Sequence, residues 1–228
     1  MVTGSLEDSA EDYSKNYKLN IFLIRHGQSE ANVNLDLEGQ DVIKANLTEE
    51  GRKQAAKLGK FLSKTKTNFD YVYSSTLPRS IQTTEICLEN MDSHVYIRKV
   101  EDIIEFDPNF KKSVVPKEIN QLKMRSEKIR RQGSWFKENK GESWRMAKKR
   151  ITDWFLNEIV FNLKYENRDI NIGIFSHGAI IKCLLMEIMS FDEIFLENIY
   201  IENTSICQLQ FSNDGWVIYG INDRRHFV

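Results

Sequence analysis

The stretch Leu19–Asn32 reads LNIFLIRHGQSEAN and passes from an apolar run into a cationic side chain, an imidazole and a glycine. Its first six residues are almost continuously apolar, which predicts a strand covered on both faces of a sheet. The strand delivers Arg25 and His26 at its carboxyl end, where ligands bind in open α/β sheets. Gly27 lets the backbone turn there, or lets a ligand approach its N–H.

A second stretch, Ile172–Ala179, repeats this pattern with an apolar strand, His177, Gly178 and the start of a helix. A helix start offers free N–H groups and the positive end of a dipole, both suited to phosphate. Alone, His177 would favour a structural role, but two such junctions in one sheet can converge on one pocket. A neutral imidazole can attack phosphorus, and the guanidinium of Arg25 can bind phosphoryl oxygens.

A third stretch, Tyr73–Thr84, places Pro78 and Arg79 at the start of a helix. Proline fits the first turn of a helix, so Arg79 is expected to point from that turn toward the strand ends. A surface salt bridge is the alternative role for Arg79.

Outward from these stretches, strands and helices alternate along the chain. We expect strands at 19–24, 69–73, 95–98, 170–175, 205–211 and 216–221, and helices at 48–64, 79–88, 144–163 and 180–189. This order predicts an α/β fold, a three-layer, doubly wound, mostly parallel sheet with helices on both faces. Thr48 is the expected N-cap of the first helix, and the last two strands form a hairpin through the turn 213–215.

We expect a disordered N-terminal tail at 1–17 and a single domain at 18–228, with a basic insertion at about 106–141. The insertion is either a solvated helix face or a surface that recognises a second anionic group of a substrate. The net charge of −1, from 32 basic and 33 acidic residues, argues against a general nucleic-acid or membrane-surface binder.

Three widely spaced cysteines, Cys87, Cys183 and Cys207, lie in apolar runs and read as buried free thiols in a reducing compartment. No apolar stretch approaches the ~20 residues that span a bilayer, and the first residues lack the pattern of a signal peptide. We therefore expect a cytoplasmic protein with no membrane partner. The sequence does not indicate an oligomeric state.

Together these motifs resemble the histidine phosphatase superfamily, in its phosphoglycerate-mutase-like branch (branch 1), and the likeness covers nearly the whole ordered chain. The resemblance rests on Arg25-His26-Gly27, the Ser-x-Leu-x-Arg pattern ending at Arg79, Ser176-His177-Gly178, Leu47–Gly51, Gly141–Ser143 with Arg150, and Asn222–His226.

The resemblance implies that His26 is the nucleophile that forms a phosphohistidine. It implies that Arg25, Arg79 and His177 line the phosphate pocket and stabilise charge on the transferring group. The further residues expected at the substrate pocket are Gln28, Ser29, Asn32, Glu38, Gly39 and Gly178.

The family's proton donor is a carboxylate after the third strand, and the Ile-x-Glu frame selects Glu105 here. Asp102 and Asp107 stay open as alternatives, because acidic residues crowd this segment. The donor must be protonated to neutralise the leaving alkoxide. No metal or cofactor is implied, because two arginines and two imidazoles take the place of a cation.

The expected activity is a metal-independent phosphatase acting on a phosphorylated small molecule or phosphoprotein. A phosphoglycerate mutase-type phosphotransferase is the alternative, supported by Lys117, Arg130 and Arg131 in the insertion. Glu38 opposes it, because its charge would repel a second anionic group at the pocket mouth. A non-catalytic phosphate-binding scaffold and a zinc hydrolase on the two histidines are further alternatives. The zinc enzyme is disfavoured because Arg25 would oppose a bound cation.

Overall fold

A six-stranded sheet runs through the molecule in the order β3-β2-β4-β1-β5-β6. The first four strands in that order are parallel, and β5 and β6 add an antiparallel hairpin beside β1. The strands span β1 Leu19–Arg25, β2 Tyr71–Ser75, β3 Ile97–Val100, β4 Ile170–Ser176, β5 Ile206–Ser212 and β6 Gly215–Asp223. This computed structural model describes residues 17–34, 36–37, 39–105, 142–166, 168–192 and 198–228.

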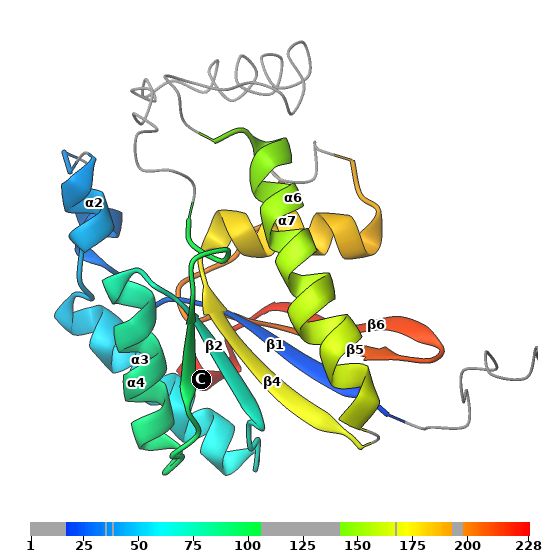
Figure 1. Cartoon of the computed structure of the whole chain (residues 1–228). Helices are drawn as coiled ribbons and strands as arrows, with labels where there is room; N and C mark the ends of the chain where they lie inside the picture. The colour runs from blue at the N-terminus through cyan, green and yellow to red at the C-terminus, as the bar shows by residue number, and fades with distance from the viewer. Residues whose placement is uncertain (1–16, 35, 38, 106–141, 167, 193–197) are drawn as a thin grey trace, which may run out of the picture.

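Helices cover both faces of the sheet (Figure 1). Helices α3 and α4 pack together on one face, and α6 and α7 pack together on the other. The helices span α1 Glu30–Val33, α2 Gln40–Lys44, α3 Glu49–Lys64, α4 Pro78–Asn90, α6 Trp144–Trp154, α7 Gly178–Met189, the π-helix η2 Phe155–Phe161, and the 3-10 helices η3 Lys164–Glu166 and η4 Arg225–Phe227. The predicted three-layer, mostly parallel α/β fold is confirmed.

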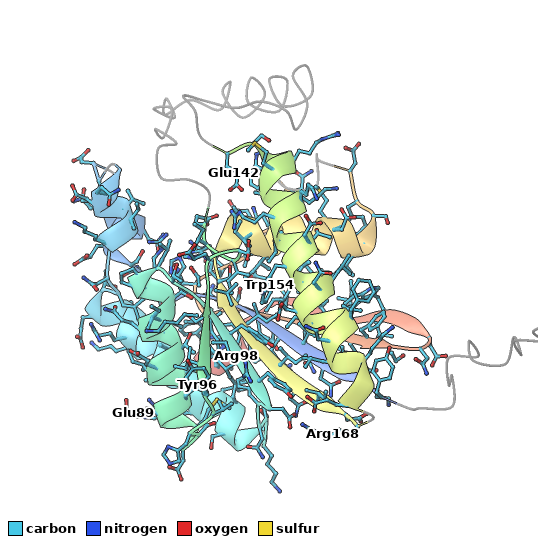
Figure 2. All side chains as sticks on the ribbon, viewed as in Figure 1. Glu89, Tyr96, Arg98, Glu142, Trp154 and Arg168 are labelled. Atoms are coloured by element: carbon cyan, nitrogen blue, oxygen red, sulfur yellow. The ribbon has the colours of Figure 1, made fainter. Side chains whose placement is uncertain are left out.

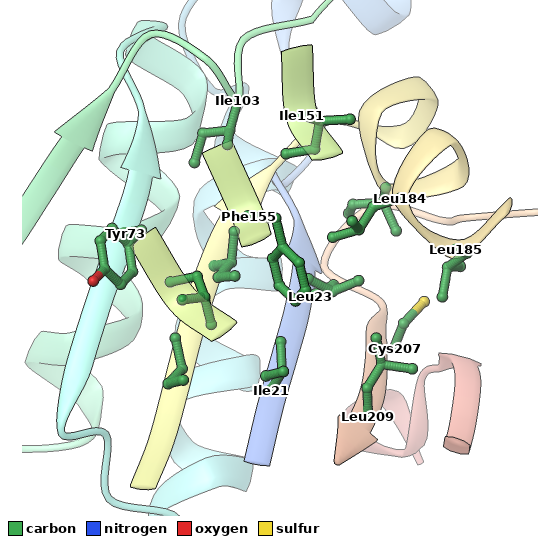
Figure 3. Packing of buried hydrophobic residues seen from close by; sticks show 14 of the residues in the cluster. Ile21, Leu23, Tyr73, Ile103, Ile151, Phe155, Leu184, Leu185, Cys207 and Leu209 are labelled. Carbon is green, nitrogen blue, oxygen red and sulfur yellow. The ribbon is translucent and has the colours of Figure 1, made fainter. Parts of the chain in front are cut away.

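Strand β1 shows how one apolar run serves two hydrophobic cores. Ile21 and Leu23 belong to the cluster under α6 and α7, whereas Phe22 and Ile24 belong to the cluster under α3 and α4. Successive side chains of a strand point to opposite faces, so a central strand covered on both sides needs an unbroken apolar sequence. Figure 3 shows Ile21 and Leu23 in the first cluster, close to Phe155.

Two strands begin later than the apolar pattern predicts. We expected strands at 69–73 and 95–98, whereas β2 begins at Tyr71 and β3 at Ile97. Strand β2 continues through two serines that are fully buried, so a prediction from hydrophobic residues alone places the end of this strand too early. Among the described strands β3 pairs only with β2, and an edge strand tolerates polar residues such as Arg98.

The helices also differ in detail from the prediction. The helix expected at 144–163 divides into α6 and the π-helix η2, which buries Phe155, Ile159 and Val160. The helix expected at 180–189 begins at Gly178 instead. Two short helices, α1 and α2, lie between β1 and α3, where we expected no helix. Thr48 caps α3 as predicted, and its Oγ1 accepts a hydrogen bond from the backbone N–H of Gly51 at 3.0 Å.

The N-terminal tail and the basic insertion at 106–141 lie outside the described residues, apart from Tyr17. Tyr17 packs in the core under α6 and α7, so the described chain starts one residue before the expected boundary. The three cysteines are free and buried, as predicted. Among the described residues, no helix has both the length and the apolar character that crossing a bilayer requires.

Candidate active site

Two neighbouring parallel strands bring the two predicted histidines together. Strands β1 and β4 pair in a register that sets Arg25 opposite Ser176, so the next residue of each strand is a histidine. The backbone N–H of His26 donates to the carbonyl of Ser176 at 3.0 Å. The imidazole rings of His26 and His177 are both buried, with centroids 5.0 Å apart and planes 61° apart.

His26 has one ring nitrogen bound to the backbone and the other open. Its Nδ1 lies 2.7 Å from the carbonyl oxygen of Gly27. A carbonyl can only accept, so Nδ1 carries the proton and Nε2 carries the lone pair. No hydrogen bond within the described residues uses Nε2. Burial, and then the charges of Arg79 and Arg25, lower the pKa of His26 well below 6.5, which keeps this imidazole neutral and nucleophilic at pH 7.

His177 is held by the opposite ring nitrogen. It is the N-cap residue of α7, and its Nε2 lies 2.8 Å from Oγ of Ser75. Its Nδ1 is buried and has no partner among the described residues. Burial, then Arg79 and then His26, lower the pKa of His177 well below 6.5. Buried polar atoms are almost always paired, so an unpaired Nδ1 beside another imidazole marks a place for a ligand.

Two guanidiniums flank the histidines, that of Arg79 buried and that of Arg25 partly buried. Arg25 donates from Nη1 to the carbonyl of Ile201 at 2.7 Å, and its Nε is buried without a partner among the described residues. Arg79, predicted at the helix start, donates from Nη1 to the carbonyl of Val42 at 2.8 Å. Burial lowers the pKa of both arginines. Each guanidinium keeps donors that suit the oxygens of one phosphate.

The structure sets Glu105 near both arginines. Its charge raises the pKa of Arg25 and of Arg79, against the lowering by burial. Of the alternative acids, Asp102 is exposed and is not among the charges that shift the pKa of either arginine, and Asp107 lies outside the described residues. Glu202 also acts on Arg25, and sequence reasoning missed it.

Three polar residues predicted at the phosphate are already engaged with the protein. Asn32 accepts at Oδ1 from the backbone N–H of Ser29 at 3.0 Å, from Oγ of Ser29 at 3.1 Å and from Nδ2 of Asn203 at 3.3 Å. Gln28 accepts at Oε1 from Thr48 at 2.8 Å. The amide NH2 groups of Asn32 and Gln28 are the parts left for a ligand. The predicted contact of Ser29 with phosphate stays a prediction.

Of the two glycines predicted at the pocket, Gly178 is closely approached by another group, and Gly39 is not. A Cβ on Gly178 would lie 3.4 Å from Nε of Arg25, so the arginine lies against the start of α7. Gly39 is the N-cap residue of α2 with φ of +53°, which favours glycine. Glu38 lies outside the described residues.

Three supporting residues were not predicted as part of the site. The backbone N–H of Gly27 donates to Oγ1 of Thr83 at 3.0 Å, and Nδ2 of Asn203 donates to the carbonyl of His26 at 2.9 Å. Ser75 and Thr83 lie in the stretch Tyr73–Thr84 that also contains Arg79, so this stretch could have indicated both as site residues. Asn203 lies in a loop with no comparable signal.

Among the described residues, no group of three or more His, Cys, Asp or Glu side chains could hold a metal ion. The arrangement brings together two imidazoles and two guanidiniums, and the carboxylates of Glu105 and Glu202 act on Arg25. Such a cluster matches a single tetrahedral dianion.

Comparison with known sequences identifies a family. The family model described as histidine phosphatase superfamily (branch 1) matches residues 21–224. A broad-specificity phosphatase from Saccharomyces cerevisiae is 42% identical over 79 residues, which are 35% of this chain and 34% of the relative. A 2,3-bisphosphoglycerate-dependent phosphoglycerate mutase 2 from Latilactobacillus sakei is 42% identical over 72 residues, which are 32% of this chain and 31% of the relative. These matches span about a third of the length of each curated relative.

A solved structure shares the fold along nearly the whole chain. A phosphoserine phosphatase mutant from Entamoeba histolytica, in complex with phosphoserine, aligns with a TM-score of 0.72 and 21% identity. The alignment covers 92% of this chain and 100% of that chain. At this identity the likeness concerns the fold alone.

Proposed function

This chain belongs to the histidine phosphatase superfamily, branch 1, and from that membership we propose that it hydrolyses phosphomonoesters through a phosphohistidine on His26. One observation carries the proposal: the ring centroids of His26 and His177 lie 5.0 Å apart, and no hydrogen bond among the described residues uses Nε2 of His26. Arg79 adds a buried positive charge beside them, and Arg25 adds a partly buried one. A phosphate held there faces a neutral nucleophile and fixed cationic donors.

In the first step, Nε2 of His26 attacks phosphorus in line with the ester oxygen. The N–P bond forms as the P–O bond breaks, and the bonding electrons stay on the ester oxygen. Arg25, Arg79 and His177 stabilise the charge on the equatorial oxygens. The Nδ1 proton of His26 donates to the carbonyl of Gly27, which stabilises the positive charge that the ring gains on phosphorylation.

Glu105 handles the protons in both steps. Protonated at first, it gives its proton to the departing ester oxygen and becomes a carboxylate. It then takes a proton from the water that attacks the phosphohistidine, which releases inorganic phosphate and restores Nε2 of His26. The nearby charges of Arg25 and Arg79 stabilise the carboxylate form between the two steps. No step needs a metal ion.

A phosphoglycerate mutase-type phosphotransferase is the second candidate. The matched segment of the Latilactobacillus sakei mutase favours it, and the first chemical step is the same for both activities. A mutase returns the phosphoryl group of His26 to a substrate instead of water. Incubation with 3-phosphoglycerate and a bisphosphate primer separates the two: isomerisation faster than phosphate release would favour the mutase.

The direct test is phosphate release from a panel of phosphorylated metabolites and phosphopeptides, with and without EDTA. We expect turnover of at least one phosphomonoester, unaffected by EDTA and absent in His26→Ala. Turnover lost with EDTA would point to the zinc hydrolase. Saturable binding of phosphate without turnover of any ester would point to the non-catalytic scaffold.

A further inference from the structure

The segment that carries Glu105 is held by its backbone carbonyls. Nη1 of Arg150, in α6, donates to the carbonyl of Asp102 at 2.6 Å and to that of Ile104 at 3.3 Å. Oγ of Ser176 donates to the carbonyl between them, that of Ile103, at 2.7 Å. Three consecutive carbonyls directly before Glu105 therefore accept hydrogen bonds from side chains of α6 and β4.

The other two nitrogens of the Arg150 guanidinium bind the carboxylate of Glu142. Its Nε donates to Oε1 of Glu142 at 2.8 Å, and its Nη2 donates to Oε2 at 2.6 Å. The pair is mostly shielded from water, with side-chain exposures of 21% for Arg150 and 14% for Glu142. Two parallel charge-assisted hydrogen bonds fix both the position and the plane of a guanidinium. Figure 2 shows Glu142 at the start of α6.

The same segment is anchored in the core and connected to the site. Ile103 is fully buried and belongs to the same apolar cluster as Ile151 of α6 (Figure 3). Ser176, which holds the carbonyl of Ile103, directly precedes His177. The position of the backbone before Glu105 is therefore coupled to the strand end that carries a pocket histidine.

We propose that Arg150, oriented by Glu142, is a positioning residue that sets the carboxyl group of Glu105 for proton transfer to the leaving group. This role rests on the proposed function. Arg150 acts through the backbone that leads to Glu105, and the proposal gives it no contact with the reacting atoms. An error of about 1 Å in the position of a catalytic group can cost on the order of 100-fold in rate.

Lysine cannot reproduce this arrangement. Arg150→Lys keeps the positive charge, but an ammonium is a point donor and lacks the planar fork that binds Glu142 and two carbonyls together. The carboxyl group of Glu105 should then be misplaced, whereas Arg25, Arg79 and both histidines keep their own partners. Proton delivery should suffer while phosphate binding and nucleophilic attack persist.

The experiment compares kcat/KM for two esters, because kcat/KM reports the step that phosphorylates His26. β-Glycerol phosphate has a poor leaving group that needs a proton, and p-nitrophenyl phosphate has a good one that does not. We expect Arg150→Lys to lower kcat/KM about tenfold for the first ester and less than about twofold for the second. Inhibition by inorganic phosphate should be unchanged.

A double-mutant cycle shows whether Arg150 acts through Glu105. Glu105→Gln should give the same preference between the two esters as Arg150→Lys, with a larger loss. In the Glu105→Gln background, Arg150→Lys should cost less than about twofold further, because the proton is already missing. Multiplied losses in the double variant would overturn the proposal.

A matched control is available at the other end of the sheet. Arg168 also bridges two acceptors, Asp70 at 2.6 Å and Glu166 at 2.9 Å, and Figure 2 shows it far from Glu142. Arg168→Lys should leave kcat/KM for both esters unchanged. Glu142→Gln keeps the shape of the partner and weakens its hold, so it should repeat the ester preference of Arg150→Lys with a smaller loss. That variant decides the matter if Arg150→Lys does not fold.

The outcomes separate this role from the proposed function. Equal losses on both esters in Arg150→Lys or Glu142→Gln would mean that the ion pair only stabilises the fold, and would overturn the positioning role. Wild-type protein that hydrolyses neither ester nor any member of the panel would overturn the proposed function, and the positioning role with it.

Discussion

Strands β1 and β4 are each followed directly by a buried histidine and a glycine, but the two histidines turn opposite nitrogens toward the protein. His26 uses Nδ1 to bind the carbonyl of Gly27, and its Nε2 makes no hydrogen bond to the part of the chain that the structure describes. His177 uses Nε2 to bind Ser75, from another strand, and leaves Nδ1 without a partner among the described residues. The same local sequence pattern thus produces two different chemical groups.

The difference comes from what surrounds each junction. After His26 the chain continues into a loop whose Gly27 N–H is held by Thr83. After His177 a helix begins at once, so this histidine occupies the N-cap position of α7, with its side chain bonded to Ser75 instead of to the helix. A histidine that is protonated at Nδ1 has its lone pair on Nε2 and can act as a nucleophile toward phosphorus. A histidine held at Nε2 at a helix start can stabilise negative charge on the phosphoryl oxygens.

The largest expected effect separates the nucleophile from its partner. His26→Ala should lower kcat/KM by at least about 10⁴-fold, because the proposed intermediate cannot form. His177→Ala should lower it by about 10²- to 10³-fold, the usual cost of one stabilising group. Steady-state kinetics on p-nitrophenyl phosphate measures both, with the exposed His94→Ala as the control. A reversal of the two losses would exchange the roles assigned to the junctions.

The two glycines should differ in their effect on stability. A Cβ on Gly27 would lie 2.6 Å from the backbone oxygen of Gly51, a contact that no side-chain rotation relieves. A Cβ on Gly178 would lie 3.4 Å from the flexible side chain of Arg25. Gly27→Ala should lower the free energy of unfolding by about 2 kcal/mol, and Gly178→Ala should change it by less than about 0.5 kcal/mol. Urea unfolding that finds equal losses would contradict this packing.

The hydroxyl group of Ser75 should matter through His177. Ser75→Ala removes the hydrogen bond to Nε2 of His177 and frees the ring to turn, so kcat/KM should fall about tenfold and inorganic phosphate should inhibit more weakly. Ser74→Ala is the matched control, because Ser74 is also buried on β2 but binds Ser80 and the carbonyl of Ser75 instead. An effect of the same size in both variants would show that a buried hydroxyl, not the orientation of His177, is responsible.

His26 and His177 should contribute equally to the loss of stability in acid, although their roles in catalysis differ. Each has a folded-state pKa well below 6.5, so the unfolded chain binds more protons and stability falls as pH drops below 6.5. Each should account for a loss on the order of 1 kcal/mol in the free energy of unfolding between pH 7 and pH 5.5.

His26→Gln and His177→Gln should each remove that share when unfolding is measured at the two pH values. If one variant keeps the wild-type pH dependence, that histidine is already charged in the folded protein.

The sequence predicts the four central residues because each belongs to a local pattern. A continuous apolar run predicts a strand. The polar residue that follows the run therefore lies at the carboxyl end of that strand, where the pocket is expected. His26, His177 and Arg25 follow from this rule, and Arg79 follows from the proline that starts its helix. Register between β1 and β4 then brings the histidines together, which the parallel order already implies.

The rest of the site depends on contacts between segments far apart in the chain. Asn203 meets His26, and Arg150 meets the carbonyls before Glu105, but neither contact leaves a periodic trace in the sequence. The buried serines of β2 mislead in a related way. Ser75 looks like a residue of a turn by composition, yet hydrogen bonds satisfy it inside the strand. Such positions become visible only when the tertiary partners are known.

The most direct test of the account is the site of phosphorylation. A substrate labelled with ³²P is mixed briefly with the enzyme, quenched in base, and the labelled peptide is located by mass spectrometry and the phosphohistidine isomer by NMR. We predict a base-stable, acid-labile label on Nε2 of His26. A label on Nδ1 of His26, a label on His177, or turnover without any covalent label would contradict it.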